Sequence, residues 1–227
     1  MIPWLHIDTA RVPGADVDLR LMRRGAEFSM MLGPNELMNS RLSGSEEALA
    51  TLACKRIEAV KRPHLLIGGL GMGFTLRAAL AVLGSDARIT VAELVPAVIA
   101  WARGPMADMF GDSLDDPRAG VLSADVVEVI QSHAAAFDAI LLDVDNGPDG
   151  LIRKANDALY NTKGLKAIRR ALRPGGVLAV WSSGPHPQFS KRLRDAGFDV
   201  NEVAVRATTK RSGAHHVIWF AKRPRAR

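Results

Sequence analysis

Four glycines follow a short apolar segment of this chain and are spaced as in a nucleotide-binding loop. The apolar segment is Leu65–Ile67, and the glycines that follow it are Gly68, Gly69, Gly71 and Gly73. Because glycine has no Cβ, the backbone can pass close beneath a ligand, and the helix that follows begins with amides that are free to bind it. The dinucleotide fingerprint Gly-x-Gly-x-x-Gly fails, because its sixth position counted from Gly69 is Phe74. We therefore predict a loop for a nucleotide of another class.

Two acidic residues stand where a nucleoside would need hydrogen-bond acceptors. Glu93 ends the second predicted strand, 20 residues beyond Gly73, where a carboxylate can accept hydrogen bonds from both ribose hydroxyls. Asp125 follows the third strand and can accept from the exocyclic amine of adenine. It can equally cap the helix expected at 126–133, and one side chain can do both. With the remaining Gly-x-Gly-x-Gly spacing, this pattern is typical of adenosylmethionine-type sites.

A third acidic group, Asp143-Val-Asp145-Asn146-Gly147-Pro148-Asp149, follows the fourth strand. Open α/β sheets bind their ligands at this carboxyl edge. Crowded carboxylates repel one another unless a cation, an amine or a hydrogen-bond network offsets the charge. We take Asp143 as the candidate base or orienting group. Asp145 and Asp149 fit a polar turn equally well.

The elements that must position these residues alternate between strand and helix from His64 onward, with helices expected at about 95–109 and 157–172. Before them, the chain is expected to turn at 33–35. Residues 137–143 are largely apolar up to Asp143, as expected of a strand buried on both faces. No helix separates the last two strands, 198–205 and 215–221, so they should pair antiparallel. We predict an α/β fold with a doubly wound, mostly parallel, seven-stranded sheet. We expect residues 1–60 to form a small antiparallel β meander plus a helix, residues 61–222 the nucleotide-binding domain, and residues 223–227 a solvated basic tail.

Composition excludes several other classes. Hydrophobic residues make up 48% and charged residues 24% of 227 residues, which is ordinary globular composition. No signal peptide and no membrane-length apolar run is apparent, so the cytoplasm is the expected location. No Cys/His spacing indicates a metal site, and His215-His216 alternate across a strand, so they cannot chelate one metal from the same face. The single cysteine, Cys54, is expected in the core.

From about Met31 to Trp181 the chain resembles the spermidine synthase-like aminopropyltransferases, a family within the class I methyltransferase fold. The resemblance rests on Ile67-Gly68-Gly69, on Glu93 in Val-Ala-Glu-Leu, on Asp116-Pro117-Arg118, on Asp125, and on Leu-Leu-Asp143. It implies that Glu93 binds ribose, that Asp125 binds adenine, and that Asp143 orients or deprotonates the attacking amine. It also implies a small N-terminal β domain and a homodimer. The acidic turn that begins at Asp143 favours a cationic amine as the acceptor.

The chain also departs from this family. Gly71 stands where the family's loop carries an aspartate, which by resemblance meets the ammonium of decarboxylated adenosylmethionine. The family's Tyr-x-Glu aligns with Ser45-Glu46-Glu47, so that only Glu47 survives as a weak substrate-binding candidate. The family's second acid moves by one residue, to Asp145.

Because the loop acid discriminates against the carboxylate of intact adenosylmethionine, its loss favours the intact donor. The expected function is methyl transfer to an amine or other small acceptor, without a metal. The alternative is aminopropyl transfer from decarboxylated adenosylmethionine to a putrescine-like diamine. A non-catalytic nucleotide- or RNA-binding role is a third alternative. The basic tail mildly supports it, but Tyr160 is the only tyrosine and aromatic residues make up 5% of the chain.

Overall fold

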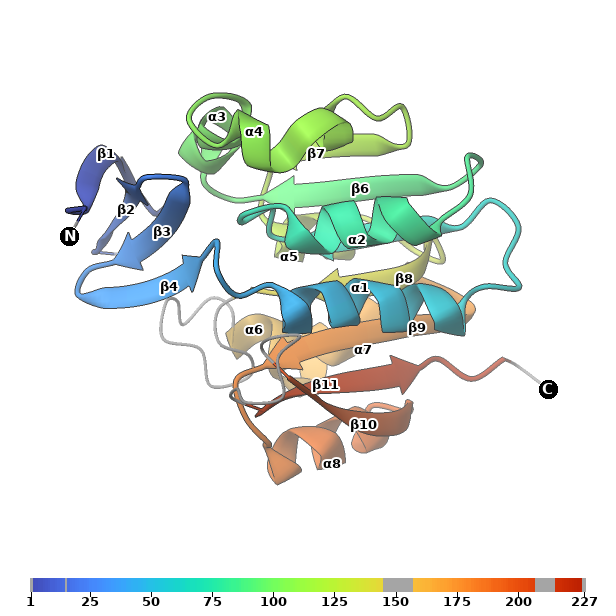
Figure 1. Cartoon of the computed structure of the whole chain (residues 1–227). Helices are drawn as coiled ribbons and strands as arrows, with labels where there is room; N and C mark the ends of the chain where they lie inside the picture. The colour runs from blue at the N-terminus through green and yellow to red at the C-terminus, as the bar shows by residue number, and fades with distance from the viewer. Residues whose placement is uncertain (1, 15, 145–156, 207–214, 226–227) are drawn as a thin grey trace.

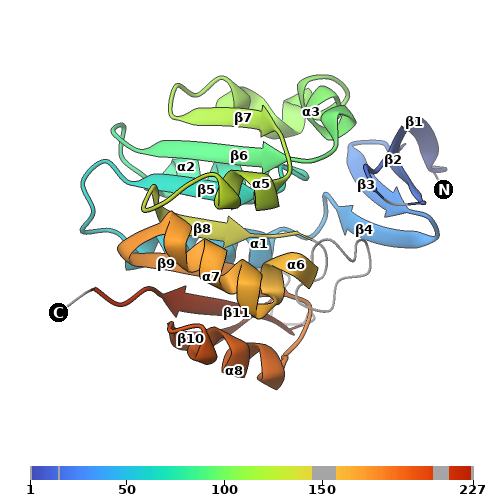
Figure 2. The same cartoon turned by 180° about the vertical axis from the view of Figure 1, so that it is seen from behind.

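A computed structural model of the chain describes residues 2–14, 16–144, 157–206 and 215–225. Its strands form two sheets, and the helices cover both faces of the larger one (Figures 1 and 2). The strands are β1 Leu5–Arg11, β2 Asp18–Arg24, β3 Glu27–Leu32, β4 Asn35–Asn39, β5 His64–Gly68, β6 Arg88–Glu93, β7 Ala119–Ser123, β8 Phe137–Leu142, β9 Leu172–Ser182, β10 Asp199–Arg206 and β11 His215–Lys222. The helices are α1 Gly44–Arg56, α2 Phe74–Val82, α3 Pro96–Arg103, α4 Ala107–Phe110, the 3₁₀ turn η1 Gly111–Leu114, α5 Val126–Gln131, α6 Asp157–Tyr160, α7 Thr162–Ala171 and α8 Pro187–Asp195.

The large sheet has the order β10-β11-β9-β8-β5-β6-β7, and the small sheet has the order β1-β2-β3-β4. Strands β7, β6, β5, β8 and β9 run parallel, whereas β11 is antiparallel to both β9 and β10. The predicted doubly wound, seven-stranded sheet with a small antiparallel appendage is therefore confirmed. The chain moves outward from β5 to β7 and returns to β8 on the other side of β5. That reversal opens the crevice in which such sheets bind ligands.

Alternating residues of each central strand feed two hydrophobic clusters, one on each face of the sheet. In β5, Leu65 and Ile67 pack with α1, α2 and α3, whereas Leu66 packs with α5 and α7. Both faces are thus covered, and the strands read as nearly continuous apolar runs for that reason. Among the described residues, no helix is long and apolar enough to cross a membrane.

The small sheet lies beyond the carboxyl ends of β5 and β6 (Figure 2). Apolar side chains of β2 and β3, such as Leu21 and Met30, belong to the same core cluster as α2 and α3. Across this junction, the indole nitrogen Nε1 of Trp101 donates a 2.7 Å hydrogen bond to Asp8, and this bond lowers the pKa of the Asp8 carboxyl group. The small sheet is therefore fixed as a cover over the ligand-binding edge.

Three predicted segments differ in detail. The turn at 33–35 leads into a fourth strand, β4, which the sequence analysis missed. The helix expected at 95–109 ends at Arg103, because Pro105 disfavours helical geometry at Gly104. The helix expected at 157–172 is divided at Asn161, whose side chain caps α7 by accepting from the amide of Gly164 at 2.9 Å.

The structure also bears on what was expected of the first sixty residues and of the C-terminal tail. Helix α1 packs beside α2 and against β9 on the large sheet, although the sequence grouped it with the small strands; the domain boundaries remain a prediction. Arg223, the first residue of the expected basic tail, is half-buried: its guanidinium donates to the carbonyl of Arg169 at 2.8 Å, and its backbone forms hydrogen bonds with Gly175 and Gly176. Residues 226–227 lie outside the described residues.

Candidate active site

The glycine loop follows β5 and turns sharply into α2. Gly69, Gly71 and Gly73 have φ angles of +85°, +50° and +74°, which side chains with a Cβ rarely adopt. The amide of Gly69 donates to the carbonyl of Ala92 at 3.0 Å, which holds the loop against β6. The loop therefore needs glycine for its backbone path, as the sequence spacing predicted.

Position 73 also requires glycine because a side chain would have no room there, and this gives a first prediction. A Cβ on Gly73 would lie 2.4 Å from a ring carbon of Phe110. We expect Gly73→Ala to lower the free energy of unfolding by about 1–3 kcal/mol through strain and overpacking, as measured by urea denaturation. Gly111→Ala is the matched control, because Gly111 also has a positive φ but a Cβ there meets nothing within 4 Å. Equal losses in both variants would refute the role of Phe110.

Glu93 is a buried carboxylate at the end of β6, and its side chain is held by backbone amides. Its Oε2 accepts from the amide of Leu70 and its Oε1 from the amide of Val95, both at 2.8 Å. Burial raises the pKa of Glu93, and these backbone bonds oppose the rise. The carboxylate is thus fixed between the glycine loop and the start of α3, with further lone pairs available to a ligand.

Asp125 and Asp143 follow β7 and β8 at the same edge of the sheet. Asp125 caps α5, since its Oδ1 accepts from the amide of Val127 at 2.8 Å. The Oδ2 of Asp143 accepts from the hydroxyl of Thr75 on α2 at 3.3 Å. Glu93, Asp125 and Asp143, which lie far apart in the sequence, therefore come together around the loop as predicted.

Asp143 shares its surroundings with a second carboxylate, Glu46 of α1. Burial, and then the negative charge of Glu46, raise the pKa of Asp143 to about 7, while the hydrogen bond from Thr75 opposes the rise. The pKa of Glu46 is also raised, chiefly by burial. A carboxyl group whose pKa lies near 7 can take up or release a proton at neutral pH, as a general base must.

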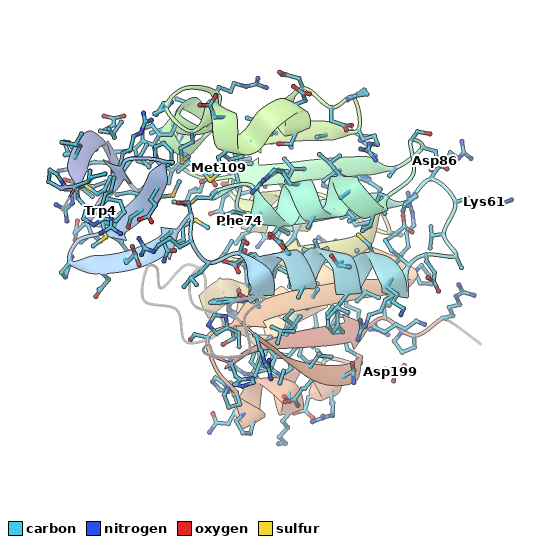
Figure 3. All side chains as sticks on the ribbon, in the orientation of Figure 1. Trp4, Lys61, Phe74, Asp86, Met109 and Asp199 are labelled. Atoms are coloured by element: carbon cyan, nitrogen blue, oxygen red, sulfur yellow. The ribbon has the colours of Figure 1, made fainter. Side chains whose placement is uncertain are left out.

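All these groups line one cavity of about 180 Å³ between the large and small sheets. Its wall combines carboxylates with apolar side chains, including Leu70, Val95 and Val126. Phe74, which also lines the cavity, lies at the end of α2 that is nearer the small sheet (Figure 3). Such a mostly apolar cavity with a few converging polar groups is the common form of a small-molecule site.

The two weaker candidates are placed differently. The side chain of Glu47 is exposed, and the α1 carboxylate in the cavity wall is that of its neighbour Glu46. The geometry thus does not support the substrate-binding prediction for Glu47. Asp145, the other candidate, lies outside the described residues, as does Asp149.

Glu46, Met38 and Trp181 are among the cavity residues that sequence reasoning missed. For Glu46 a signal existed in the sequence, because the residues three, four and seven positions later are the apolar Leu49, Ala50 and Ala53, which predicts that Glu46 lies on the core-facing side of the helix. Met38 lies in the missed strand β4. Its sulfur would be 2.9 Å from a Cβ on Gly71, so its side chain fills the space beside the loop. No local pattern indicated this contact.

Comparison with known proteins identifies the family. The profile of the spermine/spermidine synthase domain matches residues 44–195, which is more than half of the chain. The chain belongs to this family. The polyamine aminopropyltransferase of Mycobacterium tuberculosis is 31% identical over 157 residues, covering 65% of this chain and 29% of that protein. Polyamine aminopropyltransferase 2 of Pseudomonas aeruginosa is 30% identical over 158 residues, covering 65% of this chain and 42% of that protein. The chain thus spans less than half the length of these two relatives.

Solved structures agree on the fold. Spermidine synthase from Thermotoga maritima superposes with a TM-score of 0.76 at 20% identity, covering 97% of this chain and 74% of that one. A spermidine synthase in complex with the transition-state analogue AdoDATO gives a TM-score of 0.74, also at 20% identity, with coverages of 97% and 73%. The suspected family resemblance is confirmed. These comparisons do not support the expected methyl transfer; they favour the alternative, aminopropyl transfer.

Proposed function

We propose that this chain transfers an aminopropyl group from decarboxylated adenosylmethionine to a cationic amine acceptor of the putrescine type. The observation that carries the proposal is the pairing of two kinds of carboxylate in one cavity. Glu93 and Asp125 flank the glycine loop, and Asp143 and Glu46 stand together beside it. The first pair suits a nucleoside, and the second suits an amine that must lose a proton. Membership of the spermine/spermidine synthase family supports the same reaction.

The cavity fits an adenosine-bearing donor on structural grounds. Leu70, Val95 and Val126 give apolar contact area for a base, and Glu93 offers acceptor oxygens to ribose hydroxyls. The buried indole nitrogen of Trp181, also in the wall, has no hydrogen-bond partner among the described residues. A ligand acceptor would satisfy this nitrogen. The donor supplies an electrophilic carbon on its sulfonium.

The protein's own contribution is binding, orientation and proton removal. The cavity fixes the acceptor nitrogen in line with the reacting carbon, which is a large part of catalysis for a displacement reaction. An ammonium cannot attack, because its nitrogen has no free lone pair. Asp143, with its pKa raised to about 7, can accept the proton that leaves the amine. Its partner carboxylate Glu46 attracts the cationic acceptor into the same place.

The deciding experiment is a product assay with purified protein. It pairs each donor, decarboxylated or intact adenosylmethionine, with putrescine, and mass spectrometry detects aminopropyl or methyl products. Aminopropylated product from the decarboxylated donor supports the proposal. Methylated product from the intact donor alone would replace it with the reaction first expected from Gly71. No product and no donor binding by calorimetry would refute both.

A second prediction concerns the donor end of the cavity. We expect Glu93→Gln to weaken donor binding roughly 10- to 100-fold, because an amide group offers one acceptor oxygen where the site uses two. Calorimetric titration with the decarboxylated donor measures the loss. Glu128→Gln, on the exposed face of α5, is the charge-matched control and should bind normally. Equal affinity in both variants would remove Glu93 from the donor site.

A further inference from the structure

Behind Glu46, a chain of hydrogen bonds leads away from the cavity. The hydroxyl of Ser45, a residue only 1% exposed, donates to Oε2 of Glu46 at 2.6 Å. Nδ1 of His216, on β11, lies 2.9 Å from the same hydroxyl oxygen. The N-cap residue of α1 is Ser43, and Ser45 lies inside the helix. The hydroxyl of Ser45 links a carboxylate of the cavity to an imidazole that lies 171 residues away in the sequence.

His216 is held in a fixed orientation. Its ring packs edge-on against Trp181, with ring centroids 4.8 Å apart and planes at 78°, and Trp181 itself lines the cavity. The side chain is half-buried, and burial lowers its pKa. At neutral pH the imidazole is therefore neutral, with one nitrogen that carries hydrogen and one that accepts it. A neutral imidazole held in this way can take a proton on one side and release another on the other.

The three groups are consistent with two opposite hydrogen-bond directions. When Glu46 is ionised, His216 Nδ1–H donates to Ser45, and Ser45 donates to Glu46. When Glu46 is protonated, its O–H donates to Ser45, and Ser45 donates to an unprotonated Nδ1. Switching between the two directions moves one proton along the chain without moving any heavy atom. A serine that only filled space at this helix end would need neither partner.

We propose that Ser45 and His216 form the route by which the acceptor's proton leaves the cavity through Glu46. This proposal rests on the proposed function. An N–H bond of the acceptor ammonium breaks, and the Asp143–Glu46 pair gains the proton. Glu46 passes it to the Ser45 oxygen, whose own proton moves to Nδ1 of His216. His216 then releases its Nε2 proton to bulk base, and no oxidation or reduction occurs. In this scheme Ser45 and His216 are positioning residues, since neither needs to touch a substrate.

The charged surroundings of this route are few among the described residues. Strand β11 lies between β9 and β10; α1 packs against the face that carries His216, and α8 packs against the other face through Trp219. At this end, α1 contributes Glu46 and the exposed Glu47, and β10 contributes Arg206, which pairs with His215. The nearby part of β9 contributes Trp181 and Ser182, which are uncharged. If a change of His216 shifts the pH dependence of the rate, the shift would therefore report on His216, Glu46 and Asp143 together.

The test compares single-turnover rates of the whole chain with decarboxylated adenosylmethionine and putrescine. We expect Ser45→Ala and His216→Ala to lower the rate about 10- to 100-fold, with unchanged KM for both substrates. Added imidazole should restore much of the rate of His216→Ala. His215→Ala, the exposed neighbour, should match the wild type, and Ser45→Thr, which keeps the hydroxyl, should remain close to it. If an alanine variant does not fold, Ser45→Thr and His216→Gln replace it in the test. We expect the rate of His216→Gln to be reduced as in His216→Ala.

The outcomes separate the two proposals. If the wild type forms product and Ser45→Ala keeps its full rate, the proton route is refuted and the proposed function stands. A loss that appears as a raised KM without imidazole rescue would mean a structural role and would also refute the route. If the wild type forms no product at all, the proposed function fails first.

Discussion

Replacing Asp143 by asparagine is expected to reduce aminopropyl transfer by about 10²- to 10⁴-fold while leaving donor binding nearly unchanged. The change keeps the shape of the side chain and its contact with Thr75, but it removes the group that we propose as the acceptor of the amine's proton. Turnover with the decarboxylated donor and calorimetric binding of the same donor measure the two effects. Asp108→Asn, at an exposed position in α4, is the control. Wild-type turnover in the Asp143 variant would exclude Asp143 as the base.

The pH dependence of the wild type follows from the same group. Asp143 must be ionised to accept a proton, and its pKa is raised to about 7. We therefore expect kcat/KM to fall about tenfold per pH unit below 7. Thr75→Val should move this acid limb to higher pH, because the hydrogen bond from Thr75 lowers the pKa of Asp143. A profile that is flat down to pH 5 would contradict this assignment.

Stability should change in the opposite sense to activity. Because the folded-state pKa lies above the unfolded value of 3.8, protonated Asp143 favours the folded state. That contribution is fully present below pH 4 and is lost as pH rises through 7. The asparagine variant should therefore be more stable than the wild type at pH 8, by of the order of 2–4 kcal/mol, and similar to it at pH 3.5. Thermal unfolding at the two pH values tests this difference. Such a gain would mean that the base is kept in place at a cost to stability.

Replacing Gly71 by aspartate should shift donor preference toward the decarboxylated form by at least about tenfold, or 1.4 kcal/mol. An acid at this position attracts the ammonium that both donors carry and repels the carboxylate that only the intact donor carries. The backbone at φ +50° is one that aspartate and asparagine tolerate better than most residues. Calorimetric titration with both donors gives the ratio of affinities.

The side chain of Met38 determines whether the loop has room for an aspartate side chain at position 71. Its sulfur and methyl group would be 2.9 and 3.1 Å from the new Cβ, so we expect the double variant Gly71→Asp, Met38→Ala to bind the decarboxylated donor more tightly than Gly71→Asp alone. Gly71→Asn is the matched control, because it has the same shape without the charge. If Asp and Asn give the same donor ratio, charge at this position does not discriminate between donors.

Much of the donor half of the site could be predicted from the sequence because it depends on local order along the chain. The glycines must follow a strand directly, and Glu93 and Asp125 must end the next two strands. In a parallel sheet all such ends meet at one edge. Periodicity therefore predicted both the fold and the gathering of these residues. Asp143 was found for the same reason.

The part of the cavity that we assign to the acceptor was decided by tertiary contacts. Glu46 enters the cavity because α1 packs on the large sheet beside α2, and the family alignment pointed to Glu47 instead. Met38 reaches Gly71 from a strand that the sequence analysis missed, and Ser45 meets His216 across 171 residues. The raised pKa of Asp143 depends on burial and on Glu46, and neither can be obtained from spacing. Sequence alone determined which groups follow each strand; only the packing of α1 and the small sheet over that edge determined which of them share one desolvated cavity.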